Sequence, residues 1–140
     1  MKILWTVLFV ISVLYAPAQT VADTAKLKTD TVPGATLHFY RAFIRWADAP
    51  IKKVPIYIND SLVYSLKANR MISFKIIKEG KYRIAVDKKG ESEITANIKL
   101  NHEYYFRCTV EKGLWFGVPT IEAVKPAEGK AEIGEVSAVQ

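Results

Sequence analysis

The sequence predicts an all-β protein, folded as an antiparallel β-sandwich of seven or eight strands. From Thr36 onward, short runs rich in β-branched and aromatic residues alternate with turn signals that contain Asn, Asp or Gly. No long segment before Pro126 repeats apolar residues at the 3.6-residue period of a core helix. So many short strands would leave apolar surface exposed in one open sheet, whereas two packed sheets or a closed barrel would bury it.

The 140 residues divide into four expected segments. These are a signal peptide at 1–18, a flexible linker at 19–35, the β-sandwich domain at 36–125, and a tail or short helix at 126–140. The linker is small and polar, contains Pro33-Gly34, and has no apolar periodicity. Half of the residues are hydrophobic and 24% are charged, which is typical of a chain that buries a core.

The first predicted strand runs from Thr36 to Trp46 and separates into two faces by residue parity. One face carries Leu37, Phe39, Arg41, Phe43 and Arg45. The other face carries His38, Tyr40, Ala42, Ile44 and Trp46. Because the second face is the more completely apolar, we expect it to be buried. Arg41 and Arg45 would then share the exposed face as a candidate contact pair, with solubility as the ordinary alternative.

Turn signals divide the next strands into hairpins. The strand at 54–59 places three apolar residues on one face: Val54, Ile56 and Ile58. Asn59-Asp60-Ser61 predicts a tight turn into the following strand, because Asn and Asp tolerate left-handed backbone. Glu79-Gly80-Lys81 predicts a second hairpin, between strands at 71–77 and 82–86.

The carboxyl-terminal half completes the set of strands. Residues 92–100 alternate almost completely, and four of them are expected to face inward: Ile94, Ala96, Ile98 and Leu100. Residues 104–111 and 118–124 predict two further strands around the Gly113–Gly117 loop. Beyond Pro126 the chain is rich in Ala and Glu, and a short helix or a tail is expected because Pro suits the first position of a helix.

The amino terminus has the parts of a secretory signal. Lys2 precedes the uncharged apolar run Ile3–Tyr15, and Ala16-Pro17-Ala18 offers small residues for a signal peptidase. We expect cleavage after Ala18, because a retained membrane anchor would need roughly 20 apolar residues. No Cys follows the apolar run, so a lipid anchor is not expected. The mature protein is predicted to be exported, either periplasmic or secreted.

Composition and spacing argue against most chemistry. A single Cys excludes a disulfide framework and a cysteine zinc site, and His38 and His102 lack metal-ligand spacing. The formal net charge is +6, but the basic residues are scattered, so no nucleic-acid partner is expected. Neither a Gly-x-Ser-x-Gly motif nor a phosphate loop is present. We therefore expect no cofactor, no metal and no enzyme activity, with a hydrolase built on Glu91 and Glu93 as the less favoured alternative.

The Gly113–Gly117 loop is the best candidate contact site in the sequence. Leu114, Trp115 and Phe116 are consecutive and cannot all point into one core from an extended chain. They either contact a partner, with Tyr105 and its neighbour Tyr104 adding aromatic area, or cover the end of the core. Cys108 shares its parity with Phe106 and Val110, so a buried, unreactive thiol is expected.

The stretch from Thr36 to about Val124 resembles the domain of unknown function 2846, a family of small exported or lipoprotein β-domains of bacteria. The matching stretches are LHFYRA, VPIYINDSLVYSLKAN, FKIIKEGKYRIAV, IKLNHEYYFRCTVE and GLWFGVPTIEAV. The resemblance implies a β-domain and an envelope address. It implies no catalytic residues, since the family carries no established activity.

We therefore expect an exported sandwich of prealbumin-like or immunoglobulin-like character that acts as a noncatalytic binding or structural module of the cell envelope. Its partner is expected to be an envelope protein or a glycan. A carbohydrate-binding or membrane-surface module that uses Leu114, Trp115 and Phe116 is the alternative.

Overall fold

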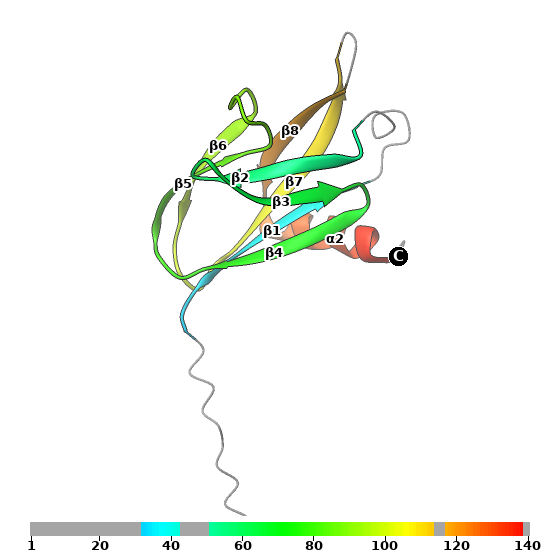
Figure 1. Cartoon of the computed structure of the whole chain (residues 1–140). Helices are drawn as coiled ribbons and strands as arrows, with labels where there is room; N and C mark the ends of the chain where they lie inside the picture. Colours follow the sequence, from blue (N-terminus) through cyan, green and yellow to red (C-terminus); the bar gives the residue numbers. More distant parts are fainter. Residues whose placement is uncertain (1–31, 43–50, 114–116, 139–140) are drawn as a thin grey trace, which may run out of the picture. The chain divides into compact units, whose positions relative to one another are not determined.

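The computed structural model describes residues 32–42, 51–113 and 117–138. Within these ranges the chain forms eight strands and one helix (Figure 1). The strands are β1 (Ala35–Arg41), β2 (Lys53–Ile58), β3 (Ser61–Lys67), β4 (Arg70–Ile76), β5 (Gly80–Ala85), β6 (Glu93–Ile98), β7 (Glu103–Lys112) and β8 (Gly117–Val124). The helix is α2 (Pro126–Ala138).

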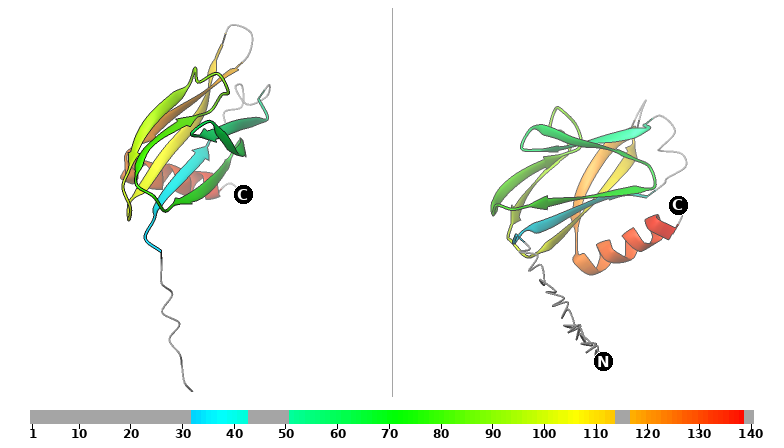
Figure 2. Two further views of the ribbon diagram at one scale, coloured as in Figure 1. Left: turned by 60° about the vertical axis from the view of Figure 1, so that its left-hand side comes forward. Right: turned by 60° about the horizontal axis from the view of Figure 1, so that its bottom comes forward.

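The strands form two four-stranded sheets that pack face to face (Figure 2). The helix-side sheet has the order β4-β1-β7-β8, and the open sheet has the order β3-β2-β5-β6. Neighbouring strands are antiparallel except β1 and β7, which are parallel. The predicted all-β sandwich is therefore confirmed.

The core lies between the two sheets and consists of their inward-facing apolar side chains. Phe39 of the helix-side sheet stacks on Phe106, with ring centroids 5.0 Å apart, and meets Phe74 edge-on at 5.9 Å. The open sheet contributes residues that are fully buried: Val54, Ile56, Leu66, Ile84, Val86 and Ile98. The inward faces predicted for the strands at 54–59 and 92–100 are confirmed except at Leu100, which lies in the turn after β6 and outside the core cluster.

β1 places in the core the face that we expected to be exposed. Leu37 and Phe39 are buried between the sheets, whereas Tyr40 belongs to a second apolar cluster outside them. The prediction for this strand is wrong because both faces of β1 are covered, one by the open sheet and the other by α2. The alternation of apolar residues along a strand cannot show which of its two faces enters the core when both faces are buried.

The connections between strands explain a second wrong prediction. Asn59 and Asp60 adopt positive φ angles of 47° and 67°, and the hairpin from β2 to β3 forms as expected. In contrast, β4 and β5 belong to different sheets, so the predicted hairpin across Gly80 does not form. β5 pairs instead with β6. A turn signal indicates that the chain reverses, but not whether the next strand joins the same sheet.

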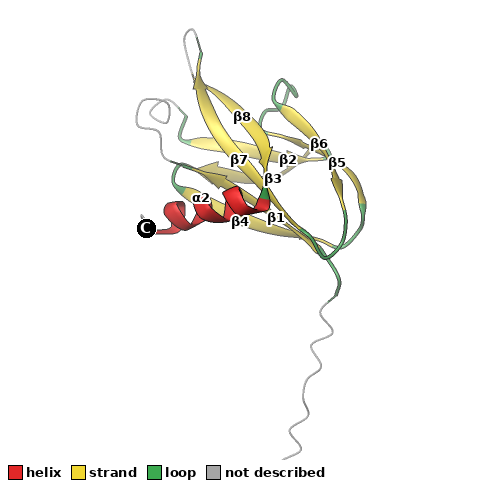
Figure 3. Ribbon diagram, turned by 180° about the vertical axis from the view of Figure 1, so that it is seen from behind, coloured by secondary structure: helices red, strands yellow, loops and turns green. Residues whose placement is uncertain are grey.

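Helix α2 packs on the outer face of the helix-side sheet (Figure 3). It begins at Pro126, where the missing backbone N–H is not needed by the helix. Gly129 lies against Tyr105, since a Cβ atom added at residue 129 would be 2.5 Å from the Tyr105 Cβ and Cγ atoms. Of the two expected alternatives for this segment, the helix forms. Among the described residues, no helix is long and apolar enough to cross a membrane.

Candidate functional site

The loop that we expected to offer a contact surface lies outside the described residues. Leu114, Trp115 and Phe116 belong to this loop, and the structure describes the two ends of its hairpin, where Lys112 pairs with Gly117. A contact through this loop stays a prediction.

Tyr105 does not offer aromatic area to a partner, contrary to the expectation. Only 4% of the surface of Tyr105 is exposed, because the ring lies beneath α2. The ring stacks on His38, with ring centroids 4.7 Å apart. Its hydroxyl donates a hydrogen bond to the Glu103 carboxylate at 3.0 Å. Burial raises the pKa of Tyr105, and Glu103 raises it further. Tyr105 therefore serves the attachment of the helix.

Arg41 is also buried, so the prediction that it shares an exposed face with Arg45 is wrong. Only 1% of its surface is exposed, and its guanidinium donates a hydrogen bond to the Ile51 carbonyl oxygen at 2.9 Å. Burial lowers the pKa of Arg41. Arg45 lies outside the described residues. Arg41 shares its parity with the core residues Leu37 and Phe39, and this explains its burial.

Two groups considered for metal binding or reactivity, His38 and Cys108, are held within the fold. The Nδ1 atom of His38 forms a 2.7 Å hydrogen bond with the Ser73 hydroxyl. Burial lowers the pKa of His38, and the nearby Glu103 carboxylate opposes this change. Cys108 is fully buried, and burial raises its pKa to about 12, so its thiol is protonated and protected. The buried thiol predicted from the sequence is confirmed. The described residues contain no group of three potential ligands that could hold a metal ion.

A network of ion pairs joins α2 to the helix-side sheet. Arg107 of β7 contacts three glutamates: Glu122 at 2.5 Å, Glu128 at 3.2 Å, and Glu132. Tyr40 donates a hydrogen bond to the same Glu132 at 2.6 Å. Burial by itself would lower the pKa of Arg107, but the carboxylates of Glu122 and Glu132 raise it. Two acidic groups of the helix, Glu128 and Glu132, are thus paired within the molecule.

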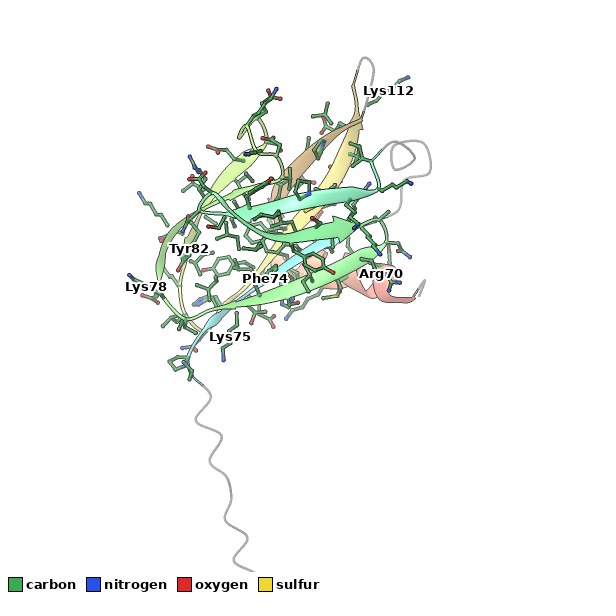
Figure 4. The ribbon with its side chains drawn as sticks, in the orientation of Figure 1. Arg70, Phe74, Lys75, Lys78, Tyr82 and Lys112 are labelled. Atoms are coloured by element: carbon green, nitrogen blue, oxygen red, sulfur yellow. The ribbon has the colours of Figure 1, made fainter. Side chains whose placement is uncertain are left out.

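The opposite arrangement is found along the edge strands β3 and β4, which belong to different sheets and do not pair with each other. We call this region the open side. Figure 4 looks onto it, with Phe74 and Tyr82 between the two sheets. Its apolar side chains pack against the core but stay partly exposed: Val63, Ile72, Phe74, Ile76 and Tyr82.

Exposed cations without carboxylate partners lie on the strands and the connection that border the open side. Lys67, Arg70, Lys75 and Lys78 are all exposed, and within the described ranges none of them makes an ion pair. The sequence contained a signal for this surface, since residues 51–82 hold seven basic and two acidic residues. Sequence reasoning missed it because these residues are spaced along three strands and gather only when the strands pack.

A shallow groove of about 300 Å³ lies on the outer face of the open sheet. Tyr57, Arg83 and Glu93 line it together with the Asn59-Asp60 turn and the loop that follows β5. The Arg83 guanidinium pairs with the Asp60 carboxylate and lies 3.8 Å from that of Glu93. Paired charges beside an aromatic ring offer hydrogen-bond donors and acceptors to a polar ligand.

No family model matches the chain, and no curated protein sequence matches it. Among solved structures, the N-terminal domain of AlgF from P. aeruginosa is similar, with 16% sequence identity and a TM-score of 0.38. The alignment covers 66% of this chain and 94% of that domain. A likeness at this score carries no argument about function.

Proposed function

We propose that this chain is an exported, noncatalytic module of the bacterial cell envelope that binds an anionic partner through its open side. The observation that carries the proposal is the separation of charge. Residues 51–82, which form β2, β3 and β4, have a net charge of +5, whereas residues 103–138, which form β7, β8 and α2, have a net charge of −2. A cationic surface attracts anionic partners and speeds their association.

The pairing of the charged side chains also supports this proposal, because several acidic groups in the described part of the chain form ion pairs within the fold while the cations of the open side do not. Four glutamates of the helix side bind Arg107 or Lys130 within the fold: Glu103, Glu122, Glu128 and Glu132. The cations of the open side lie on the same strands or connections as half-exposed apolar side chains such as Phe74. Apolar area rimmed by charge is typical of a surface that another molecule covers.

Retention on a polyanionic matrix tests the proposal. We expect the protein to bind dextran sulfate beads and to elute with salt, and the double variant Arg70→Glu/Lys75→Glu to elute at clearly lower salt. Lys88→Glu/Lys89→Glu is the matched control, because it changes the net charge equally at the loop after β5. Equal weakening by both double variants, or no retention of the parent protein, would refute the proposal.

Export and the family resemblance belong to the same proposal. If residues 1–18 are a cleaved signal, the protein recovered from the periplasm or medium of an expressing bacterium begins at Gln19. Amino-terminal sequencing of that protein is the measurement. Recovery of the unprocessed chain from the cytosol would contradict export.

A neutral glycan is the second candidate partner, and the groove at Tyr57 favours it. Sugar rings pack their C–H faces on aromatic side chains, while their hydroxyls need the donors and acceptors that Arg83 and Glu93 provide. In a glycan array, binding that is lost in Tyr57→Ala but kept in Arg70→Glu/Lys75→Glu would favour this candidate over an anionic partner.

A further inference from the structure

The amino-terminal end of the sandwich combines lysines with two exposed aliphatic side chains. Three segments meet there, namely residues 32–34, 77–81 and 98–102. Hydrogen bonds tie them together: the backbone N–H of Asn101 donates to the Gly34 carbonyl oxygen at 3.0 Å, and that of Leu100 donates to the Glu79 carboxylate at 2.9 Å. The pairs Ala35 with Ile76 and Gly80 with Ile98 place the neighbouring strands at the same end.

We call this end the lysine end, after four exposed residues: Lys75, Lys78, Lys81 and Lys99. Figure 4 shows Lys75 and Lys78 near the point where the described chain begins. The acid within the three segments, Glu79, is engaged by the backbone of Leu100. Within the described ranges, none of the four lysines makes an ion pair. This end is therefore cationic and its charges are available.

Two aliphatic side chains project among these lysines. Ile77 is 66% exposed and Val32 is 56% exposed. Ile77 directly precedes Lys78 and follows Lys75 by two positions, on the connection from β4 to β5. Water is a poor environment for such side chains, and a partner that buries them would gain free energy in addition to the electrostatic attraction.

We propose that the lysine end docks on an anionic phospholipid surface, with Ile77 and Val32 entering the boundary between headgroups and acyl chains. The inference rests on the proposed function and names its partner. Lipid phosphates match the lysines, and lysine side chains can extend along an apolar surface while their ammonium groups stay at the headgroups. A hydrated polyanionic glycan offers phosphate-like charge but no apolar layer for Ile77. Of these two partners, the lipid surface is the one that satisfies both components of the lysine end.

The experiment is cosedimentation with phosphatidylethanolamine vesicles that contain or lack phosphatidylglycerol. All variants are compared in the form in which the expressing cell accumulates the protein. We expect binding only to the vesicles that contain phosphatidylglycerol. Lys75→Glu/Lys78→Glu should weaken it roughly 25-fold, since each cation near an anionic membrane contributes roughly a five-fold factor. Ile77→Ser should weaken binding about five-fold or more through the lost insertion.

Matched controls lie at the opposite end of the same strands. Lys88→Glu/Lys89→Glu changes the net charge by the same amount as Lys75→Glu/Lys78→Glu, but beyond the far end of β5. Val118→Ser removes an aliphatic side chain that is 44% exposed at the start of β8. We expect both controls to bind within two-fold of the parent protein. Equal losses in the controls would overturn the inference, and so would binding that depends on Trp115 but not on Ile77.

The result on dextran sulfate separates the two proposals. Retention on the beads without binding to vesicles overturns the lipid partner and leaves a soluble acidic polymer or protein as the anionic partner. Absence of both kinds of binding overturns the proposed function as well. Vesicle binding that is insensitive to Ile77→Ser also overturns the inference, because attraction by charge alone needs no insertion.

Discussion

The helix-covered face of the helix-side sheet and the open side of the sandwich satisfy their charges in opposite ways. On the helix-covered face, Arg107 gathers three glutamates and Tyr40 donates to one of them. On the open side, Arg70 and Lys78 are exposed and have no carboxylate partner in the described part of the chain. The helix-side sheet contributes to both regions, so the difference lies in what covers them.

This difference indicates what each region is for. A charge that is paired and partly buried contributes to docking of the helix, and its loss leaves its carboxylate partners close together without a cation. An exposed cation contributes little to stability and is free to meet a ligand. Matched substitutions in the two regions should therefore separate effects on folding from effects on binding.

The largest expected effect is at the contact between helix and sheet. Gly129→Val should lower the free energy of unfolding by about 3 kcal/mol, because the new side chain would overlap the Tyr105 ring and push the helix away. Gly134→Val is the control on the same helix, since a Cβ atom there meets nothing within 4 Å. Urea unfolding measures both. Similar values for the two variants would show that α2 does not dock tightly.

The next effect concerns the ion-pair network. Arg107→Met should destabilise the fold by about 2 kcal/mol, since it leaves three glutamates close together without their cation. Arg70→Met on the open side should change stability by no more than about 0.5 kcal/mol. A large loss for Arg70→Met would mean that the open side also supports the fold, and the comparison would fail.

A smaller effect is expected from removing one hydroxyl group. Tyr40→Phe should cost about 1.5 kcal/mol, because the lost hydrogen bond goes to the charged carboxylate of Glu132. Tyr64→Phe, on a side chain that is 43% exposed, should be neutral to within about 0.5 kcal/mol. Thermal unfolding of the pair distinguishes them, and equal melting temperatures would contradict the role assigned to Tyr40.

The smallest expected effect is a dependence of stability on pH through His38. Burial lowers the pKa of His38 below its usual 6.5, so the unfolded chain takes up a proton more readily than the folded one. The stabilisation is therefore complete above pH 6.5 and is lost progressively as the pH falls from 6.5 toward the lower pKa of the folded state. His38→Gln should flatten the curve of urea midpoint against pH in this window. An unchanged slope would refute this origin.

A second loss of stability should follow at lower pH. Lys130 and Tyr105 hold the pKa of Glu103 below its usual value of 4.5. This contribution is present above pH 4.5 and is lost as the pH falls further. The His38 loss begins at pH 6.5 and the Glu103 loss at pH 4.5, so the change in stability between these two pH values reports on His38.

The fold was largely predictable because its signals are local. Alternation along residues 54–59 and 92–100 identified the inward faces, and Asn59-Asp60 identified a hairpin turn. Tyr105 was assigned to a contact surface incorrectly because α2 covers it, and this cover is not visible in strand parity. Arg41 was assigned incorrectly because it lies on the face of β1 that enters the core, which we expected to be exposed. The candidate site was less predictable than the fold, since the lysines that surround it come from separate strands and connections.

By itself, the sequence determined that the chain forms short paired strands around one apolar interior, because side-chain period and turn chemistry depend on near neighbours. Only the tertiary structure decided which sheet each strand joins, which face of β1 enters the core, and which charged side chains form ion pairs with the helix. These outcomes depend on contacts between residues far apart in the chain. The packing of two sheets and one helix brought Lys75, Lys78 and Lys99 to one end of the molecule and left Ile77 exposed among them.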